Sequence, residues 1–127
     1  MIYGIGSDIV NITRLEKGPD FLNRFIKRSM SPVEQETMER RCLADNSARI
    51  LYVAKRFAAK EAVAKAFGTG FRDGLYLSDI EVRNDNIGKP FVILHGQAAE
   101  LYKKIGAKHI HLSLSDDYPF AQAVAVI

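Results

Sequence analysis

The longest regular pattern in the chain lies between residues 52 and 70. Alanine, lysine and glutamate dominate this segment, which contains no proline and stops at Gly68-Thr69-Gly70. Strong helix formers followed by glycines are typical of a helix and its C-terminal stop. Asp45-Asn46-Ser47 offers several N-cap side chains just before the first apolar positions. The pattern therefore predicts a helix from about residue 47 to 67.

Apolar residues mark a strand at each end of the chain. Residues 2–10 alternate, so that Ile5 and Ile9 share one face, and residues 120–127 are nearly all apolar. The other face of the first strand carries Gly4, Gly6, Asp8 and Val10. We expect both segments to be buried strands.

Between these strands, caps and turns delimit several further elements. Asp20 is expected to cap a helix over 21–28, and the capping box at 31–34 starts a helix that reaches about Cys42. After the long helix we expect a strand over 75–83, a turn at 84–88, a hairpin strand over 90–94, a helix over 97–105 and a strand over 109–115. This order predicts an α+β fold, with an antiparallel sheet packed against the long helix.

Length and composition place the chain among ordinary globular proteins. Its 127 residues are 47% hydrophobic and 26% charged, so we expect one domain over 1–127. We find no bilayer-spanning run and no signal-peptide pattern, and Cys42 is the single cysteine. These features predict a cytoplasmic protein that does not bind membranes.

Charge is distributed unevenly along the chain. Residues 1–65 hold 12 lysines and arginines against 8 acidic residues, whereas residues 66–127 hold 6 against 7. A basic N-terminal half suggests an acidic partner, although a solvated basic face is the simpler explanation of charge alone. Nucleic acid is not favoured, because arginine and aromatic residues are not interleaved as stacking platforms require.

Glu61 is the most informative residue of the long helix. At about 100° per residue it falls on the apolar arc that also holds Ile50 and Phe57. A carboxylate is costly to bury unless it meets a cation or strong donors. Lys65 lies one turn on, so an ordinary ion pair between the two residues is one interpretation. The other is a functional acid.

Asp8 is a second carboxylate at a position where a buried residue is expected. It lies in the first strand beside Gly4 and Gly6, and small residues allow another backbone or a ligand to approach closely. This Gly-x-Gly lacks the third glycine and the helix start of a dinucleotide fingerprint. Asp8 could be a structural acid, but together with Glu61 it points toward a shared cation.

These two acids suit a magnesium site better than a zinc site. Mg²⁺ typically takes one or two carboxylates together with water and phosphates, and no Cys/His cluster accompanies them. Candidate phosphate partners are Lys65, Arg56, Lys60 and the backbone N–H groups of Gly68, Thr69 and Gly70, with further donors on a strand face carrying His109, His111, Ser113 and Ser115. A Ser/His hydrolase is disfavoured because the chain has no Gly-x-Ser-x-Gly elbow. The residues alone support a Mg²⁺-dependent site for a phosphate-rich ligand.

Five segments of the chain, in order, resemble the holo-acyl-carrier-protein synthase family. They are Met1 to Val10, Arg14, the Arg-Phe-Ala-Ala-Lys-Glu-Ala run that continues to Gly70, Asn-Asp-Asn-Ile-Gly-Lys-Pro at 84–90, and His-Leu-Ser-Leu-Ser at 111–115. This family belongs to the 4′-phosphopantetheinyl transferases. The resemblance covers essentially the whole chain, and the segment over 56–70 is the most specific part of it.

The resemblance implies transfer of phosphopantetheine from coenzyme A to a serine of apo-acyl carrier protein, as in fatty acid biosynthesis. It implies that Asp8 and Glu61 bind Mg²⁺, that Lys65 contacts the pyrophosphate, and that Arg56 and His111 line the coenzyme A site. The adenosine 3′,5′-bisphosphate part of coenzyme A is the leaving group. The residue that accepts the serine proton stays open among Glu61, a water on the metal and His111.

The resemblance also implies partners. Arg14, Arg24, Phe25 and Arg28 resemble the helix on which the acidic carrier docks. Short members of the family are homotrimers with active sites between subunits, and the length of this chain fits that type. One departure is Asp116, since many relatives carry histidine at this position.

Two other functions are compatible with parts of the sequence. A Mg²⁺-dependent nucleotide pyrophosphatase would use the same acids with water as the nucleophile. A non-enzymatic adaptor would bind an acidic partner through the basic segment 14–28, and it would leave Asp8 and Glu61 unexplained. A transferase needs a carrier protein for turnover, whereas the pyrophosphatase does not. A transferase also needs Mg²⁺ and coenzyme A, whereas the adaptor does not.

Overall fold

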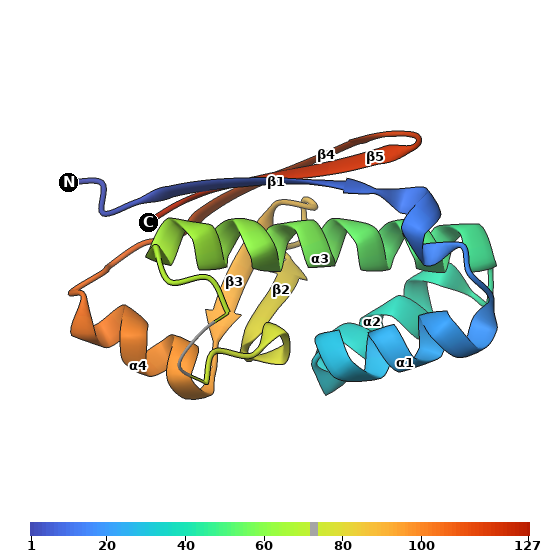
Figure 1. Cartoon of the computed structure of the whole chain (residues 1–127), viewed down its shortest axis with the longest axis horizontal. Coiled ribbons are helices and arrows are strands. Elements are labelled where there is room, and N and C mark those ends of the chain that lie inside the picture. The colour runs from blue at the N-terminus through green and yellow to red at the C-terminus, as the bar shows by residue number, and fades with distance from the viewer. Residues whose placement is uncertain (72–73) are drawn as a thin grey trace.

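The long helix is the axis of the fold in the computed structural model, which describes residues 1–71 and 74–127. Helix α3 runs over Asn46–Phe67, as the sequence predicts. The Asp45 side chain caps it by accepting a hydrogen bond from the backbone N–H of Ala48 at 3.2 Å, and Gly68 ends it in the left-handed conformation. Figure 1 shows α3 between a sheet on one side and the remaining elements on the other.

A three-stranded antiparallel sheet covers the first side of α3. It contains β1 (Ile5–Asn11), β5 (Phe120–Val126) and β4 (His111–Asp117) in the order β1-β5-β4. The buried side chains of the central strand β5 are the alanines Ala121, Ala123 and Ala125. Because these side chains are small, the helix lies close to the sheet.

A hairpin and three helices occupy the second side of α3. The hairpin consists of β2 (Ile80–Asn84) and β3 (Pro90–Leu94), and the helices are α1 (Pro19–Ser29), α2 (Pro32–Cys42) and α4 (Gly96–Lys104). Short 3₁₀ helices lie at Ile12–Leu15 and Leu77–Asp79. The predicted α+β class is confirmed, although the described residues form two antiparallel sheets instead of one. None of the helices in these residues has the length and apolar character of a membrane span.

Several predicted boundaries are wrong. The first strand begins at Ile5 and not at residue 2, and the strand expected over 109–115 covers His111–Asp117. The strand expected over 75–83 begins only at Ile80, because Leu77–Asp79 turns as a 3₁₀ helix where the apolar alternation slips. Asp20 is not a cap, since α1 begins at Pro19 after Gly18. Asp20 instead lies in the first turn of α1, where a carboxylate interacts favourably with the helix dipole.

Only one face of β1 is buried. The predicted alternation is correct, because Gly6 and Val10 are buried while Ile5 and Ile9 are 68% and 63% exposed. The strand expected to be buried is therefore buried on its inner face alone in a single chain. The outer face of the sheet presents large apolar side chains to solvent, since Phe120 of β5 is also exposed.

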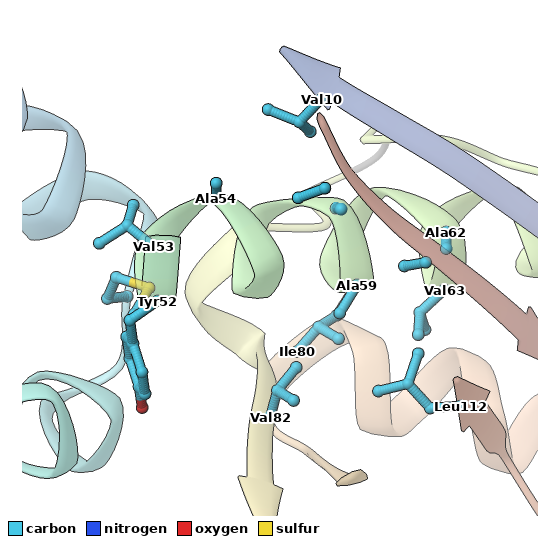
Figure 2. Close-up of a cluster of buried hydrophobic side chains, with 14 of the residues drawn as sticks. Val10, Tyr52, Val53, Ala54, Ala59, Ala62, Val63, Ile80, Val82 and Leu112 are labelled. Atoms are coloured by element: carbon cyan, nitrogen blue, oxygen red, sulfur yellow. The ribbon is translucent and has the colours of Figure 1, made fainter. Parts of the chain in front are cut away.

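The hydrophobic core surrounds most of α3. Val53 and Val63 of α3 are fully buried, as are Ile80 and Val82 of β2, and Figure 2 shows Leu112 reaching the same cluster from β4. The single apolar arc expected from the sequence is thus wrong, because α3 is packed on both of its sides. Glu61 is half-buried beside this core and does not lie within it.

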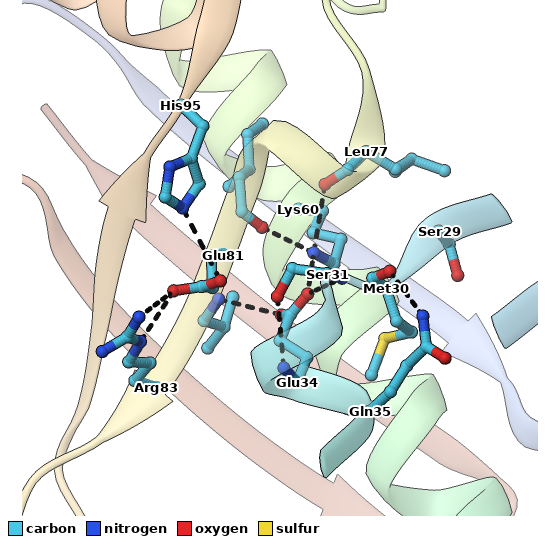
Figure 3. A network of polar contacts seen from close by, with 12 residues as sticks. Ser29, Met30, Ser31, Glu34, Gln35, Lys60, Leu77, Glu81, Arg83 and His95 are labelled. Atoms are coloured by element: carbon cyan, nitrogen blue, oxygen red, sulfur yellow. Dashed lines mark hydrogen bonds and ion pairs between the residues drawn. The ribbon is translucent and has the colours of Figure 1, made fainter. Parts of the chain in front are cut away.

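A buried ion pair ties α2 to α3. Lys60 Nζ donates to Glu34 Oε1 at 2.7 Å, and both side chains are fully buried. Lys60 also donates to the carbonyls of Leu77 and Ile80, while Glu34 Oε2 accepts from the backbone N–H of Val82 at 2.9 Å (Figure 3). Every one of these contacts joins separate elements, so the pair fixes the second side of α3 to α2 and β2.

Candidate active site

Two glycines let β1 lie directly against the backbone of α3. A Cβ atom at Gly6 would be 2.0 Å from the carbonyl oxygen of Ala62, and one at Gly4 would be 2.0 Å from that of Ala66. No side chain fits at such distances, so both positions require glycine. The close approach predicted beside Asp8 is therefore to another backbone, and it brings Asp8 to the flank of α3.

Lys65 joins the two elements at this contact. Its Nζ donates to Asp8 Oδ1 at 3.1 Å and to the backbone carbonyl of Ser7 at 2.9 Å. The lysine side chain is 51% exposed, and that of Asp8 only 16%. Among the described residues, Lys65 forms its ion pair with Asp8 and not with Glu61, so the simple pair expected within the helix is wrong.

Glu61 completes a group of two acids and one lysine. Burial raises the pKa of the Glu61 carboxyl above its ordinary value, and the nearby charge of Asp8 raises it further, while Lys65 opposes both effects. Because two carboxylates share one cation, the group holds more negative than positive charge when both are ionised. An added cation would relieve this repulsion.

The donor set fits Mg²⁺. Two carboxylates from separate elements are the protein ligands that Mg²⁺ commonly takes, with water and phosphate oxygens filling the other positions. No cluster of three or more histidine, cysteine or acidic ligands occurs among the described residues, which disfavours a zinc cage. Asp8 and Glu61 are the residues that would hold the ion.

Lys60 is not available to bind a phosphate, contrary to the sequence prediction. It is fully buried, and its three donors go to Glu34 and two carbonyls. Burial lowers the pKa of Lys60, whereas Glu34 opposes that shift. The sequence did not indicate that Glu34 pairs with Lys60, because the capping box already gave Glu34 a local role.

The turn after α3 offers fewer donors than predicted. The N–H of Gly68 bonds to the carbonyl of Lys65 at 2.9 Å, and that of Gly70 bonds to the carbonyl of Ala64 at 3.3 Å. These two N–H groups close the helix, so they do not point at a ligand. Neither bond uses the N–H of Thr69, so this is the backbone donor of the turn that remains for a ligand.

Arg56 lies on the other side of α3 from the acids. Glu61 is five positions further along the helix, which places Arg56 about 140° from it around the helix axis. It is buried, stacks on the Tyr52 ring at 4.0 Å and donates to Asn84 Oδ1. It lines a pocket of about 380 Å³ that lies beside β2 and β3 and holds two further cations, Arg41 and Lys55.

His111 is also separated from the acids within one chain. It is exposed on β4, with its ring stacked at 6.0 Å on that of His109. It pairs through Val126 with Ile5, so its side chain shares the outer face of the sheet with Ile5. Asp8 points to the inner face. The structure thus brings together Asp8, Glu61 and Lys65, and leaves Arg56 and His111 apart from them.

Comparison with known proteins gives this arrangement a family. The model described as the 4′-phosphopantetheinyl transferase superfamily matches residues 4–123. The chain belongs to this superfamily. The resemblance drawn from the sequence motifs is therefore confirmed.

Individual members of the superfamily match over nearly the whole chain. The holo-[acyl-carrier-protein] synthase of Paramagnetospirillum magneticum is 48% identical over 132 residues, covering 100% of this chain and 96% of that protein. The structure of the synthase from Neisseria meningitidis has a TM-score of 0.85 and 35% identity, covering 99% and 98% of the two chains. That from Bacillus anthracis, in complex with CoA (3′,5′-ADP), has a TM-score of 0.80 and 37% identity, covering 99% and 96%.

In this superfamily member a basic helix lies next to the acids. Phe57, one turn before Glu61 on α3, packs edge-on against Phe25 of α1 with ring centroids 5.2 Å apart. Arg28 lies over the Phe25 ring at 5.9 Å, and Arg24 is exposed on the same helix. Arg14 is exposed in the short 3₁₀ helix that leads to α1. Phe57 therefore joins the helix that bears Glu61 to the predicted docking helix, a contact that the sequence did not indicate.

Proposed function

We propose that this protein transfers the 4′-phosphopantetheine group of coenzyme A to a serine of apo-acyl carrier protein, with Mg²⁺ bound. The observation that carries the proposal is the group of Asp8, Glu61 and Lys65, which is open to solvent and adjacent to a basic helix. The match to holo-[acyl-carrier-protein] synthases over nearly the whole chain supports the same reaction.

The reaction breaks a phosphoanhydride bond of coenzyme A and forms a phosphate ester bond to serine. The serine oxygen attacks the phosphorus that bears the pantetheine arm, and the bond from that phosphorus to the bridging oxygen breaks. Adenosine 3′,5′-bisphosphate leaves with the electron pair, and the serine proton passes to a base. Phosphoryl transfer of this kind is accelerated mainly by positioning and by neutralisation of charge.

The residues of this chain have distinct parts in that step. Lys65, half-exposed beside Asp8, would donate to the pyrophosphate oxygens. Mg²⁺, held by Asp8 and Glu61, would supply additional positive charge for the same oxygens. Glu61 is the side-chain candidate for the base that belongs to the group itself, whereas His111 of the same chain lies on the outer face of the sheet.

We further propose a homotrimer whose active sites lie between subunits. Arg56 and Glu61 project to different sides of α3, so a coenzyme A molecule that contacts both would take them from two copies. The outer sheet face exposes Ile5, Ile9 and Phe120, and apolar side chains of this size favour burial against another chain.

The carrier would dock on α1 in this proposal. Arg14, Arg24 and Arg28 present positive charge to an acidic protein, and Phe25 connects them through Phe57 to the helix that bears Glu61. We place the reaction in the cytoplasm and in fatty acid biosynthesis. The buried free thiol of Cys42 suits a reducing compartment.

The intact mass of an apo-acyl carrier protein tests the proposed reaction. Incubation with this protein, coenzyme A and Mg²⁺ should add the mass of one phosphopantetheine, and EDTA should prevent the change. A carrier whose acceptor serine is replaced by alanine serves as the control and should keep its mass. Hydrolysis of coenzyme A without any change of the carrier would indicate a pyrophosphatase instead.

A further inference from the structure

The turn between β4 and β5 supports the short segment that bears Arg14. The backbone N–H of Ile12 donates to the carbonyl of Pro119 in this turn at 2.7 Å, and the turn lies at the same end of the molecule as the 3₁₀ helix over Ile12–Leu15 (Figure 1). The side chains of Ile12 and Leu15 are also buried in the core. The backbone at Arg14 is therefore held in place without help from surface side chains.

Tyr118, in the same turn, reaches an acid of this segment. Its hydroxyl donates to the Glu16 carboxylate, with Oε1 at 2.9 Å and Oε2 at 3.3 Å. The hydrogen bond to Glu16 raises the pKa of Tyr118, so the hydroxyl keeps its proton at neutral pH. Both side chains are exposed, and a hydrogen bond at such a place is not needed to complete the core.

Glu16 is an acid among cations. Arg14 lies two positions before it and Lys17 one position after it, and all three side chains are exposed. A carboxylate at this place can pair with a neighbouring cation or repel an acidic partner, and either effect weakens a basic surface. In the part of the chain that the structure describes, Glu16 forms no ion pair with either cation. The Tyr118 hydroxyl takes its carboxylate, and Lys17 lies over the Phe21 ring at 5.1 Å.

We infer that Tyr118 is a positioning residue for carrier recognition, because its hydroxyl holds the Glu16 carboxylate and keeps Arg14 available to the acidic carrier. This inference rests on the proposed function, in which the carrier docks on Arg14 and α1. A phenol suits the task because it donates to the carboxylate without using a cation of the docking surface. Loss of the hydroxyl frees the Glu16 side chain and leaves the backbone of the segment where it is.

Removal of a single hydroxyl group tests this role. In Tyr118→Phe the Glu16 carboxylate competes with the carrier for Arg14, so the KM for apo-acyl carrier protein should rise about threefold, as expected for one exposed ion pair. The kcat, the KM for coenzyme A and the melting temperature should not change. Tyr76→Phe removes the hydroxyl of a tyrosine that is equally exposed, at 66%, and should leave all four quantities unchanged.

A double-mutant cycle separates shielding of Glu16 from direct contact between Tyr118 and the carrier. Glu16→Gln removes the charge that competes for Arg14, and its own effect on the carrier KM is the reference for the change in net charge. Tyr118→Phe should then raise the carrier KM in the wild-type background and have no effect in the Glu16→Gln background. A rise of the same size in both backgrounds would overturn the inference, because Tyr118 would then act by touching the carrier itself.

Two further outcomes keep this inference apart from the proposed function. If wild type modifies the carrier and Tyr118→Phe has the same carrier KM as wild type, the inference about Tyr118 is wrong and the proposed function stands. If wild type leaves the apo-carrier unmodified in the intact-mass assay, the proposed function fails and the inference falls with it.

Discussion

Two neighbouring residues of α3, Lys60 and Glu61, belong to polar groups of opposite character. Lys60 is fully buried and fully paired, with Glu34 and two backbone carbonyls as its partners. Glu61 is half-buried and shares one exposed lysine with a second acid, Asp8. The first group is closed and electrically balanced, whereas the second is open and carries excess negative charge.

The difference shows how one helix can serve both stability and chemistry. A buried charge is tolerated only where its partners lie within the protein, and such a group has no capacity left for a ligand. An acid pair at the edge of the core keeps that capacity, because a cation from solvent can complete it. Lys60 and Glu61 project about 100° apart around α3, so one points into the core and the other to its edge.

The largest effect is expected from breaking the closed group. Glu34→Gln leaves Lys60 without its counter-charge inside the core, so the free energy of unfolding should fall by about 3–5 kcal/mol. Urea unfolding measures this loss. Glu36→Gln, at an exposed acid of the same helix, should change the free energy of unfolding by less than about 0.5 kcal/mol. A loss below 1 kcal/mol in Glu34→Gln would show that the pair is not essential to the fold.

Neutralising the open group should affect turnover and not folding. Glu61→Gln removes a ligand of the proposed Mg²⁺ and the preferred base, so kcat should fall at least about a hundredfold. The melting temperature should stay the same or rise slightly, because the substitution also removes repulsion with Asp8. Steady-state transfer assays and thermal unfolding make the two measurements, and near-normal turnover in saturating Mg²⁺ would contradict the assignment.

The close contact of β1 with α3 sets the distance between the two acids. Gly6→Ala forces a Cβ toward the Ala62 carbonyl, so the strand has to move, at a cost of about 1–3 kcal/mol. Transfer activity of the folded protein should fall as well, since Asp8 moves with the strand. Gly106→Ala, where the structure leaves open space but the φ of 71° disfavours a side chain, is the control for destabilisation without movement of β1, and it should retain activity. Full activity in Gly6→Ala would show that the spacing of the acids is not critical.

The smallest effect is expected at the docking surface. Reversing Arg14 and Arg24 to glutamate should raise the apparent KM for the carrier about tenfold and leave the KM for coenzyme A unchanged. Both residues are exposed on the proposed docking surface and do not belong to the group of Asp8, Glu61 and Lys65. Reversal of Lys103 and Lys104, on α4 at the opposite end of the molecule in Figure 1, gives the same change in net charge. Equal effects of the two double variants would argue against a specific docking helix.

The sequence predicted the parts of this molecule that depend on local signals. Helix α3 was predictable because strong caps bound it at both ends, and the capping box of α2 is present as expected. The association of Asp8 with Glu61 was also predictable, since each is a carboxylate at a position where a buried residue is expected. Local chemistry sufficed for these features.

Contacts between distant elements were beyond reach of the sequence. Lys60 looked like a phosphate ligand because its partner Glu34 lies in another helix and already had a local role. Arg56 and His111 were grouped with the acids, but within one chain they are apart from them. Arg56 projects about 140° around α3 from Glu61, and His111 lies on the face of β4 that points away from α3. An ion pair between Lys55 and Asp116 likewise depends on how α3 packs against the sheet.

The most direct test of the open group as a metal site is thermal unfolding with Mg²⁺. Wild type and Glu61→Gln would be melted with saturating coenzyme A over a series of Mg²⁺ concentrations. Wild type should gain about 5–10 °C when Mg²⁺ reaches about 100 times its Kd, whereas Glu61→Gln should gain almost nothing. An equal gain in both proteins would show that Mg²⁺ binds elsewhere, and the proposed role of Asp8 and Glu61 would be wrong.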